Sequence, residues 1–199
     1  MNKQSQVAVI IQRDAEDHQL TSGSLAYRIE KKVLSKVFTR NLMKHFANDT
    51  VTCFFDDLYD LLEDYYGKTV AEKVIKDLIK LVIKLGITER SDHFTADQQK
   101  QLDQIRIHLR NLCLTVISFV NVSFSYNRDY LQSLFNDLYT SLRSVVETTL
   151  SEKSVRRVNL VYEYLSKEEF TNDMFKNGVN EKLRKVIVDL DGLLVQQNI

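Results

Sequence analysis

The sequence contains no proline and only five glycines in 199 residues. A chain of this length without proline has no stiff, proline-rich linkers. Its apolar residues recur every three or four positions almost throughout, which is the period of a helix, and strand signals are nearly absent. The absences therefore predict helices joined by short turns, in one good-sized domain or at most two small ones.

Net charge is also lacking, since 27 basic residues balance 27 acidic ones. A neutral chain has no overall field that would recruit nucleic acid. No basic stretch alternates with surface aromatic residues that could stack on bases. We therefore expect no nucleic-acid partner.

Cysteine is scarce as well. Cys53 and Cys113 lie sixty residues apart in apolar surroundings, and this spacing matches neither a disulfide framework nor a zinc site. Buried free thiols are the expected outcome, and they fit a reducing, intracellular compartment.

Long apolar runs are missing too. The run at 7–11 is shorter than a signal-peptide core and is followed by acidic residues. The longest apolar patch, 112–120, falls well short of the roughly twenty residues that span a bilayer. If the protein meets a membrane, we expect the contact to be made from outside.

Catalytic and metal-binding patterns are not found. The chain has no glycine-rich phosphate loop and no nucleophile elbow, and the acidic residues of 49–66 lack the spacing of a calcium site, so we interpret them as a solvated helix face. We therefore expect a non-enzyme without a metal or cofactor. The histidines, which show no ligand spacing, are His18, His45, His93 and His108.

The periodicity predicts six or seven helices whose neighbours run antiparallel in a bundle. Capping boxes at Thr69–Glu72 and Thr95–Gln98 mark two of the helix starts, and Asn127 marks a third. Residues 166–172 are expected to interrupt the helical pattern. The expected helices span about 24–48, 49–67, 69–88, 95–122, 127–150, 151 or 154 to 166, and 180–195.

The segment EKVIKDLIKLVIKLGI (72–87) combines nine aliphatic residues with four lysines. At about 100° per residue, Lys73, Lys76, Lys80 and Lys84 fall within an arc of roughly 80°, and the aliphatic residues cover roughly 200° of the remainder. The pattern indicates a helix that is packed on both flanks and exposes a lysine edge. A membrane-surface helix fits less well, because no aromatic anchor is present.

Charge is also sorted by helix, since 25–48 is mainly basic and 49–66 is acidic. One interpretation is that neighbouring helices form surface ion pairs of small energy. The alternative starts from Lys32, Lys36 and Arg40, which give the first helix its own basic edge. Two such edges beside an apolar interior would suit a ligand that is anionic at one end and apolar at the other, such as a phospholipid or fatty acid.

Two segments, AYRIEKKVLSKVFTR (26–40) and KVIKDLIKLVIKLG (73–86), closely resemble the tumour necrosis factor-α-induced protein-8 family, also called the TIPE family. The resemblance runs from about residue 24 to 190 and is that of a divergent or invertebrate-like member. It implies an N-terminal arm at 1–22, partly helical or flexible, and a single TIPE-homology domain at 23–199.

The resemblance also implies a fold of antiparallel helices around an elongated hydrophobic cavity. Family members bind phosphoinositides, with the acyl chains in the cavity and the headgroup at a basic mouth, and some transfer lipids. Lys73 stands where the family often has arginine. The implied headgroup residues are Lys31, Lys32, Lys36, Arg40, Lys73 and Arg90. The implied cavity-lining residues are Val33, Val37, Ile75, Leu78, Ile79, Val82, Leu112, Val116, Phe119, Leu134, Leu138 and Leu142.

The resemblance therefore implies phospholipids, phosphoinositides and an anionic membrane surface as partners. It also implies a cytoplasmic protein that associates reversibly with the inner face of membranes. Signalling in apoptosis, immunity or phosphoinositide pathways is the implied setting. The alternative is a helical adaptor that regulates cell death or autophagy by recruiting signalling proteins, without lipid transfer. The acidic helix at 49–66 is the feature that suits the adaptor best.

Overall fold

The computed structural model describes residues 49–90, 94–122, 125–176 and 180–196, and these residues form helices and no strand. An all-α bundle is thereby confirmed. The expected arm at 1–22 and the first helix at 24–48 lie outside the described residues. The described helices are α4 (Asp49–Tyr66), α5 (Lys68–Arg90), α6 (Ala96–Asn121), α7 (Arg128–Thr149), α8 (Glu152–Leu165), α9 (Glu168–Lys176) and α10 (Glu181–Gln196).

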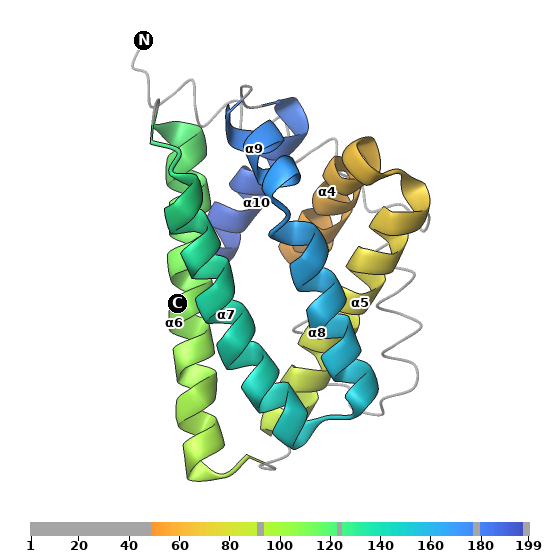
Figure 1. The fold of residues 1–199 in the computed structure, drawn as a ribbon, viewed down its shortest axis with the longest axis vertical. Helices are drawn as coiled ribbons and strands as arrows, with labels where there is room; N and C mark the ends of the chain where they lie inside the picture. The colour runs from red at the N-terminus through yellow and green to blue at the C-terminus, as the bar shows by residue number, and fades with distance from the viewer. Residues whose placement is uncertain (1–48, 91–93, 123–124, 177–179, 197–199) are drawn as a thin grey trace.

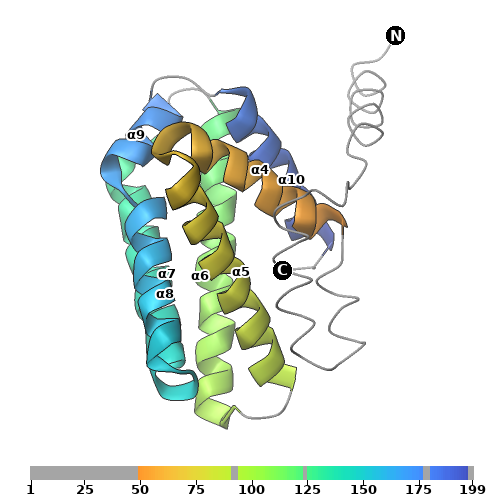
Figure 2. The same ribbon diagram turned by 90° about the vertical axis from the view of Figure 1, so that its right-hand side faces the viewer.

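The helices form an elongated bundle in which chain neighbours fold back on each other (Figure 1). α6 and α7 run side by side in opposite directions, and α8 returns along both α7 and α5. α10 packs against α4 and α6 at one end of the bundle (Figure 2). None of the described helices combines the length and apolar character needed to cross a membrane.

The turn between α4 and α5 depends on a glycine. Gly67 has a φ angle of 81°, in the left-handed region that side chains with a Cβ atom disfavour. Its N–H donates to the Glu63 carbonyl at 2.8 Å, and its own carbonyl accepts from Ala71 N at 3.2 Å. Gly67 therefore ends one helix and starts the next.

This arrangement makes the predicted start of α5 wrong. The capping box would place Thr69 outside the helix, whereas α5 begins at Lys68 and holds Thr69 in its first turn. The Gly67 carbonyl already provides the first helical hydrogen bond, so no side-chain cap at Thr69 is needed. At the other end, α5 continues through Gly86 to Arg90, slightly beyond the expected end.

Other boundaries agree with the sequence signals. Thr95 Oγ1 accepts from Gln98 N at 3.2 Å while Thr95 N donates to Gln98 Oε1 at 2.9 Å, which is the expected capping box. Asn127 Oδ1 accepts from Tyr130 N at 3.0 Å and caps α7. α8 follows Ser151, and α10 follows Asn180.

The predicted break at 166–172 is mostly helix. α9 begins at Glu168, so the interruption is limited to Ser166 and Lys167. Phe170 and Met174 are one turn apart in α9 and both are buried. The prediction missed this helix because the segment EEFTND is mostly polar. Burial of Phe170 and Met174 is enough to hold a short helix against the bundle.

The buried apolar residues form three clusters. The largest joins α4, α5, α9 and α10 around Leu62, Ile75 and Ile79. A second joins α5, α7 and α8 around Leu81, Val146 and Val158. The third joins α6 and α7 and is made of Leu112, Phe119, Leu131 and Leu134. α5 contributes to two of the three clusters, on opposite flanks.

The two cysteines do not form a disulfide. Cys113 is buried in α6, as expected, and burial raises the pKa of its thiol to about 11. A thiol with so high a pKa carries almost no thiolate at neutral pH and reacts slowly. Cys53 is half-buried, so the expectation of full burial is wrong for this residue.

The acidic residues of α4 do not all lie on a solvated face, which corrects the sequence interpretation. Asp57 is buried and shares a hydrogen bond with Asp189 of α10. Desolvation of Asp189, followed by the charge of Asp57 and their hydrogen bond, raises the pKa of Asp189 to about 7. Two carboxyl groups this close retain one proton between them near neutral pH.

This pair predicts a pH-dependent stability. The pKa of Asp189 is about 7 in the folded protein, compared with 3.8 for an ordinary aspartate. Between about pH 4 and pH 7 the folded state therefore binds more protons than the unfolded state does. The pair therefore stabilises the fold at low pH, and its contribution is lost as pH rises through 7. We expect Asp189→Asn to be more stable than the wild type at pH 8, by on the order of 1 kcal/mol after allowance for partial exposure.

Urea unfolding followed by circular dichroism at pH 5, 6, 7 and 8 measures this difference. Asp191→Asn is the matched control, because Asp191 is exposed on the same helix, and its stability should follow the wild type at every pH. Parallel pH profiles for the wild type and Asp189→Asn would contradict the shared proton.

Candidate functional site

The structure describes two of the six predicted headgroup residues. Lys73 and Arg90 are both exposed on α5. They are seventeen positions apart, which is about 25 Å along a helix axis, so they would face different parts of a bound lipid or of a membrane surface. The other four, Lys31, Lys32, Lys36 and Arg40, lie outside the described residues.

The predicted cavity-lining residues are distributed over all three apolar clusters. Ile75 and Ile79 belong to the first, while Leu78 contacts the first and the second. Val82 is 37% exposed, and Val33 and Val37 lie outside the described residues. Of the remaining residues, Leu142 packs on the second cluster, Val116 contacts the first and third, and Leu112, Phe119, Leu134 and Leu138 belong to the third.

α8 packs alongside α5 (Figure 1), and the lysine edge of α5 meets α8 at Lys84. Lys84 Nζ donates to Ser154 Oγ of α8 at 3.1 Å, and this contact fixes which neighbour the edge faces. Lys76 is exposed, whereas Lys80 and Lys84 are half-buried. We call this border the α5–α8 seam. Its members are Lys76, Asp77, Lys80 and Lys84 from α5, and Lys153, Ser154 and Arg157 from α8.

Arg157 is the most buried cation of the seam. Its side chain is 9% exposed, and its Nε donates to Asp77 Oδ1 at 3.1 Å. Its Nη1 is also buried and has no hydrogen-bond partner among the described residues. The guanidinium therefore has one carboxylate partner and one unsatisfied nitrogen, although a buried donor normally has a partner.

The lysines of the seam lie close enough to act on one another. Desolvation is the main cause that lowers the pKa of Lys80, and the charges of Lys76, Arg157 and Lys153 add to it against the opposing charge of Asp77. The pKa of Lys84 is lowered first by desolvation and then by Arg157 and Lys153. The seam thus gathers five basic side chains and one carboxylate, Asp77.

Sequence reasoning found the α5 half of the seam and missed the α8 half. The available signal was the segment KSVRR at 153–157, in which Lys153 and Arg157 are four residues apart and share a helix face. Nothing in that spacing says which helix lies opposite. The pairing of α5 with α8 is a property of the tertiary fold.

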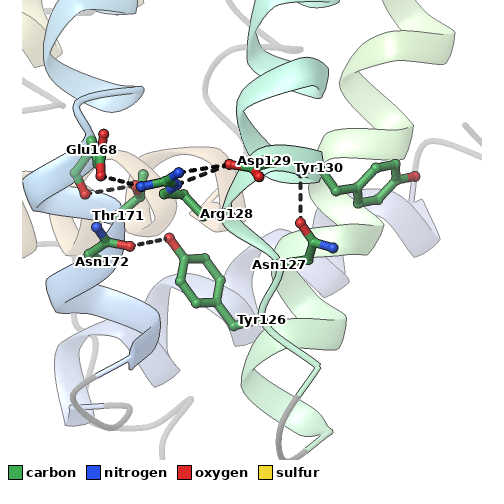
Figure 3. Close-up of polar contacts among 8 residues, drawn as sticks. All are labelled: Tyr126, Asn127, Arg128, Asp129, Tyr130, Glu168, Thr171 and Asn172. Carbon is green, nitrogen blue, oxygen red and sulfur yellow. Dashed lines mark hydrogen bonds and ion pairs between the residues drawn. The ribbon is translucent and has the colours of Figure 1, made fainter.

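A second polar cluster, where α7 and α9 begin, has the opposite charge balance (Figure 3). Arg128 contacts both Asp129, at 3.0 Å, and Glu168, at 2.5 Å. Tyr126 OH donates to Asn172 Oδ1 at 2.9 Å and ties the same two regions together. These acidic residues and Arg128 border a surface cleft of about 330 Å³. With two carboxylates for one cation, this cleft is unsuited to an anion.

Comparison with known proteins identifies the family. The family model for tumor necrosis factor alpha-induced protein 8-like proteins matches residues 20–197. This chain belongs to the tumor necrosis factor alpha-induced protein 8 family. The resemblance inferred from 26–40 and 73–86 is therefore confirmed.

Relatives from insects and vertebrates match most of this member's length. The Drosophila melanogaster protein salivary glands marred is 30% identical over 181 residues, which cover 89% of this chain and 96% of that protein. Human tumor necrosis factor alpha-induced protein 8 is 32% identical over 181 residues, covering 89% of this chain and 91% of its own. The chicken protein of the same name is 35% identical over 150 residues, covering 75% and 80%.

The charge balance of the seam predicts unequal effects for the two partners of its ion pair. Asp77→Asn removes the carboxylate and leaves Arg157 among lysines, so we expect a loss of about 3 kcal/mol in the free energy of unfolding. Arg157→Gln also breaks the pair, but it relieves repulsion with Lys80 and Lys84, and Asp77 keeps a lysine nearby. We therefore expect a smaller loss than for Asp77→Asn.

Chemical denaturation of the two variants tests this order. The control is Arg143→Gln, because Arg143 forms an exposed pair with Glu147 at 2.7 Å and such pairs contribute about 1 kcal/mol or less. If Arg157→Gln is the more destabilised seam variant, the seam does not carry the excess positive charge described above.

Proposed function

We propose that this protein binds phosphoinositides or related phospholipids, with the headgroup at a basic mouth and the acyl chains in an apolar interior. It would act as a peripheral membrane protein in apoptotic, immune or phosphoinositide signalling, and lipid transfer is one form this activity would take. The observation that carries the proposal is the basic edge of α5 beside an apolar sector that packs on both flanks.

The exposure of the edge supports electrostatic docking. Lys73 and Lys76 are exposed, and neither forms an ion pair with a described acidic residue. Each lysine near an anionic membrane contributes about 1 kcal/mol of attraction. Lysine binds phosphate as a point charge, without the bidentate grip of arginine. Lys73 would therefore favour anionic surfaces broadly, rather than one headgroup geometry.

The adaptor alternative is weaker on this structure. It relied on the acidic residues of α4 as a surface that recruits proteins. Asp57 is buried against α10, and Asp64 is paired with Lys182 at 2.7 Å. Part of the acidic face therefore serves the contact between α4 and α10, which leaves fewer charges for a partner.

Charge reversal tests the docking step. The triple variant Lys31→Glu, Lys32→Glu and Lys73→Glu should lose binding to vesicles that contain phosphatidylinositol bisphosphate, by about a hundredfold or more, because three attractions of about 1 kcal/mol disappear. Vesicle co-sedimentation with the full chain measures the loss, and circular dichroism confirms that the variant remains folded.

The control reverses three exposed lysines on other helices, Lys100→Glu, Lys167→Glu and Lys185→Glu, so that the net charge changes equally. This control should retain most of the binding. Equal losses in the two triple variants would mean that net charge alone governs vesicle binding, and the basic mouth would then be rejected.

Lipid content tests the interior independently of docking. Mass spectrometry of the purified full chain, first under native conditions and then after solvent extraction, should reveal phospholipid or fatty acid near one molecule per protein. A lipid-free mass, together with no uptake of added phosphoinositide, would remove the cavity from the proposal.

A further inference from the structure

Arg157 has a buried hydrogen-bond donor without an acceptor among the described residues. Its guanidinium is held in the seam by Asp77, while Nη1 is buried and unpartnered among the described residues. Leaving a buried donor without an acceptor costs roughly 1–3 kcal/mol, and more for a charged group. The bound state of the protein is therefore expected to place an acceptor against this nitrogen.

The charges around Arg157 determine what kind of acceptor fits. The charges of Lys80 and Lys84 each interact with those of Arg157 and Lys153. Asp77 is the single carboxylate of the seam. Arg106, the one other described arginine that is not exposed, contacts both Glu89 and Asp103. A neutral acceptor such as water would satisfy Nη1 but would leave the excess charge uncompensated.

The start of α8 adds to the positive potential. Lys153 and Ser154 lie in its first turn, where the helix dipole favours an anion. The Ser154 N–H donates to the Ser151 carbonyl at 2.7 Å, the Ser151 side chain caps no backbone N–H of α8, and Ser154 Oγ accepts from Lys84. The hydroxyls, the lysines and the arginine are thus gathered from two helices at one place.

We propose that the α5–α8 seam binds a phosphate group through Arg157, Lys80, Lys84 and Lys153. A phosphomonoester carries close to two negative charges and three acceptor oxygens, which matches several converging cations better than a singly charged carboxylate does. The phosphate group could belong to a soluble ion, a soluble inositol phosphate or a lipid headgroup, since the chemistry is shared. The site does not depend on whether the interior holds a lipid.

Because Nη1 is buried, an anion that reaches Arg157 would have to displace the groups that cover it. Nη1 is covered, but Lys80 and Lys84 are long, half-buried side chains at the border of the seam. When they turn toward an entering anion they would donate to it. Because these groups are half-buried, their attraction is screened by salt less than that of Lys73.

The test uses the full chain and soluble probes. Inorganic phosphate and inositol trisphosphate are titrated in chloride buffer of constant ionic strength, with calorimetry and phosphorus NMR as readouts. We expect saturable binding that weakens about tenfold or more in the double variant Lys80→Gln and Lys84→Gln. Lys100→Gln on α6 is the control and should bind as the wild type does.

A second variant keeps the test decisive if the double variant does not fold. Lys153 is exposed, so Lys153→Gln should leave the fold intact, and it should still weaken binding several-fold. Tighter binding of inositol trisphosphate than of phosphate would identify a headgroup as the source of the ligand, whereas equal binding would identify free phosphate. Both results support the seam.

Two results would overturn the inference. One is the absence of saturable binding of either soluble probe to the wild type. The other is binding that is unchanged in both seam variants. If vesicles still bind the wild type in either case, and the Lys31, Lys32 and Lys73 reversal abolishes it, the proposed lipid function stands and the seam alone is rejected.

Discussion

The packing of α5 is the constraint on which the rest of the structure depends. Ile75 and Ile79 on one flank belong to the cluster shared with α4, α9 and α10, while Leu81 on the other belongs to the cluster shared with α7 and α8. Because both flanks are buried, α5 cannot rotate about its axis without exposing apolar side chains, at roughly 25 cal/mol for each Å². The lysine edge is therefore held at the border with α8.

The described helices bring like charges together at two places, and the repulsion is relieved differently at each. Asp57 and Asp189 meet between α4 and α10, where retaining one proton removes the repulsion. Arg157 of the seam cannot be relieved in the same way, because arginine does not lose its proton in proteins. Asp77 neutralises one of five cations there. An external anion would compensate the charge that stays on Arg157, and its unpartnered Nη1 marks where the anion would be held.

Local sequence signals predicted the long helices, because a helix cap or a helical period is set by residues that are close in the sequence. The Thr95 box and the Asn127 cap need only a few neighbouring residues, and periodicity located the lysine edge. Features set by distant segments were missed. The burial of Asp57 depends on α10, α9 is held by Phe170 and Met174 against the bundle, and Arg157 joins the site because α8 lies beside α5. A pattern of acids or lysines on one helix does not reveal which member another helix will cover.

The lysines of the α5 edge differ in exposure, and this difference suits them to two electrostatic roles. The sequence pattern alone, a single stripe of lysines, suggests one role. Lys73 and Lys76 are exposed, so their fields reach into solvent, act on a distant anionic surface and weaken with salt. Lys80 and Lys84 are half-buried beside Arg157, where desolvation strengthens short contacts and makes an unmatched charge costly. The first pair is suited to attracting a phosphate-bearing surface and the second to holding one phosphate group, and the fixed rotation of α5 keeps them in line.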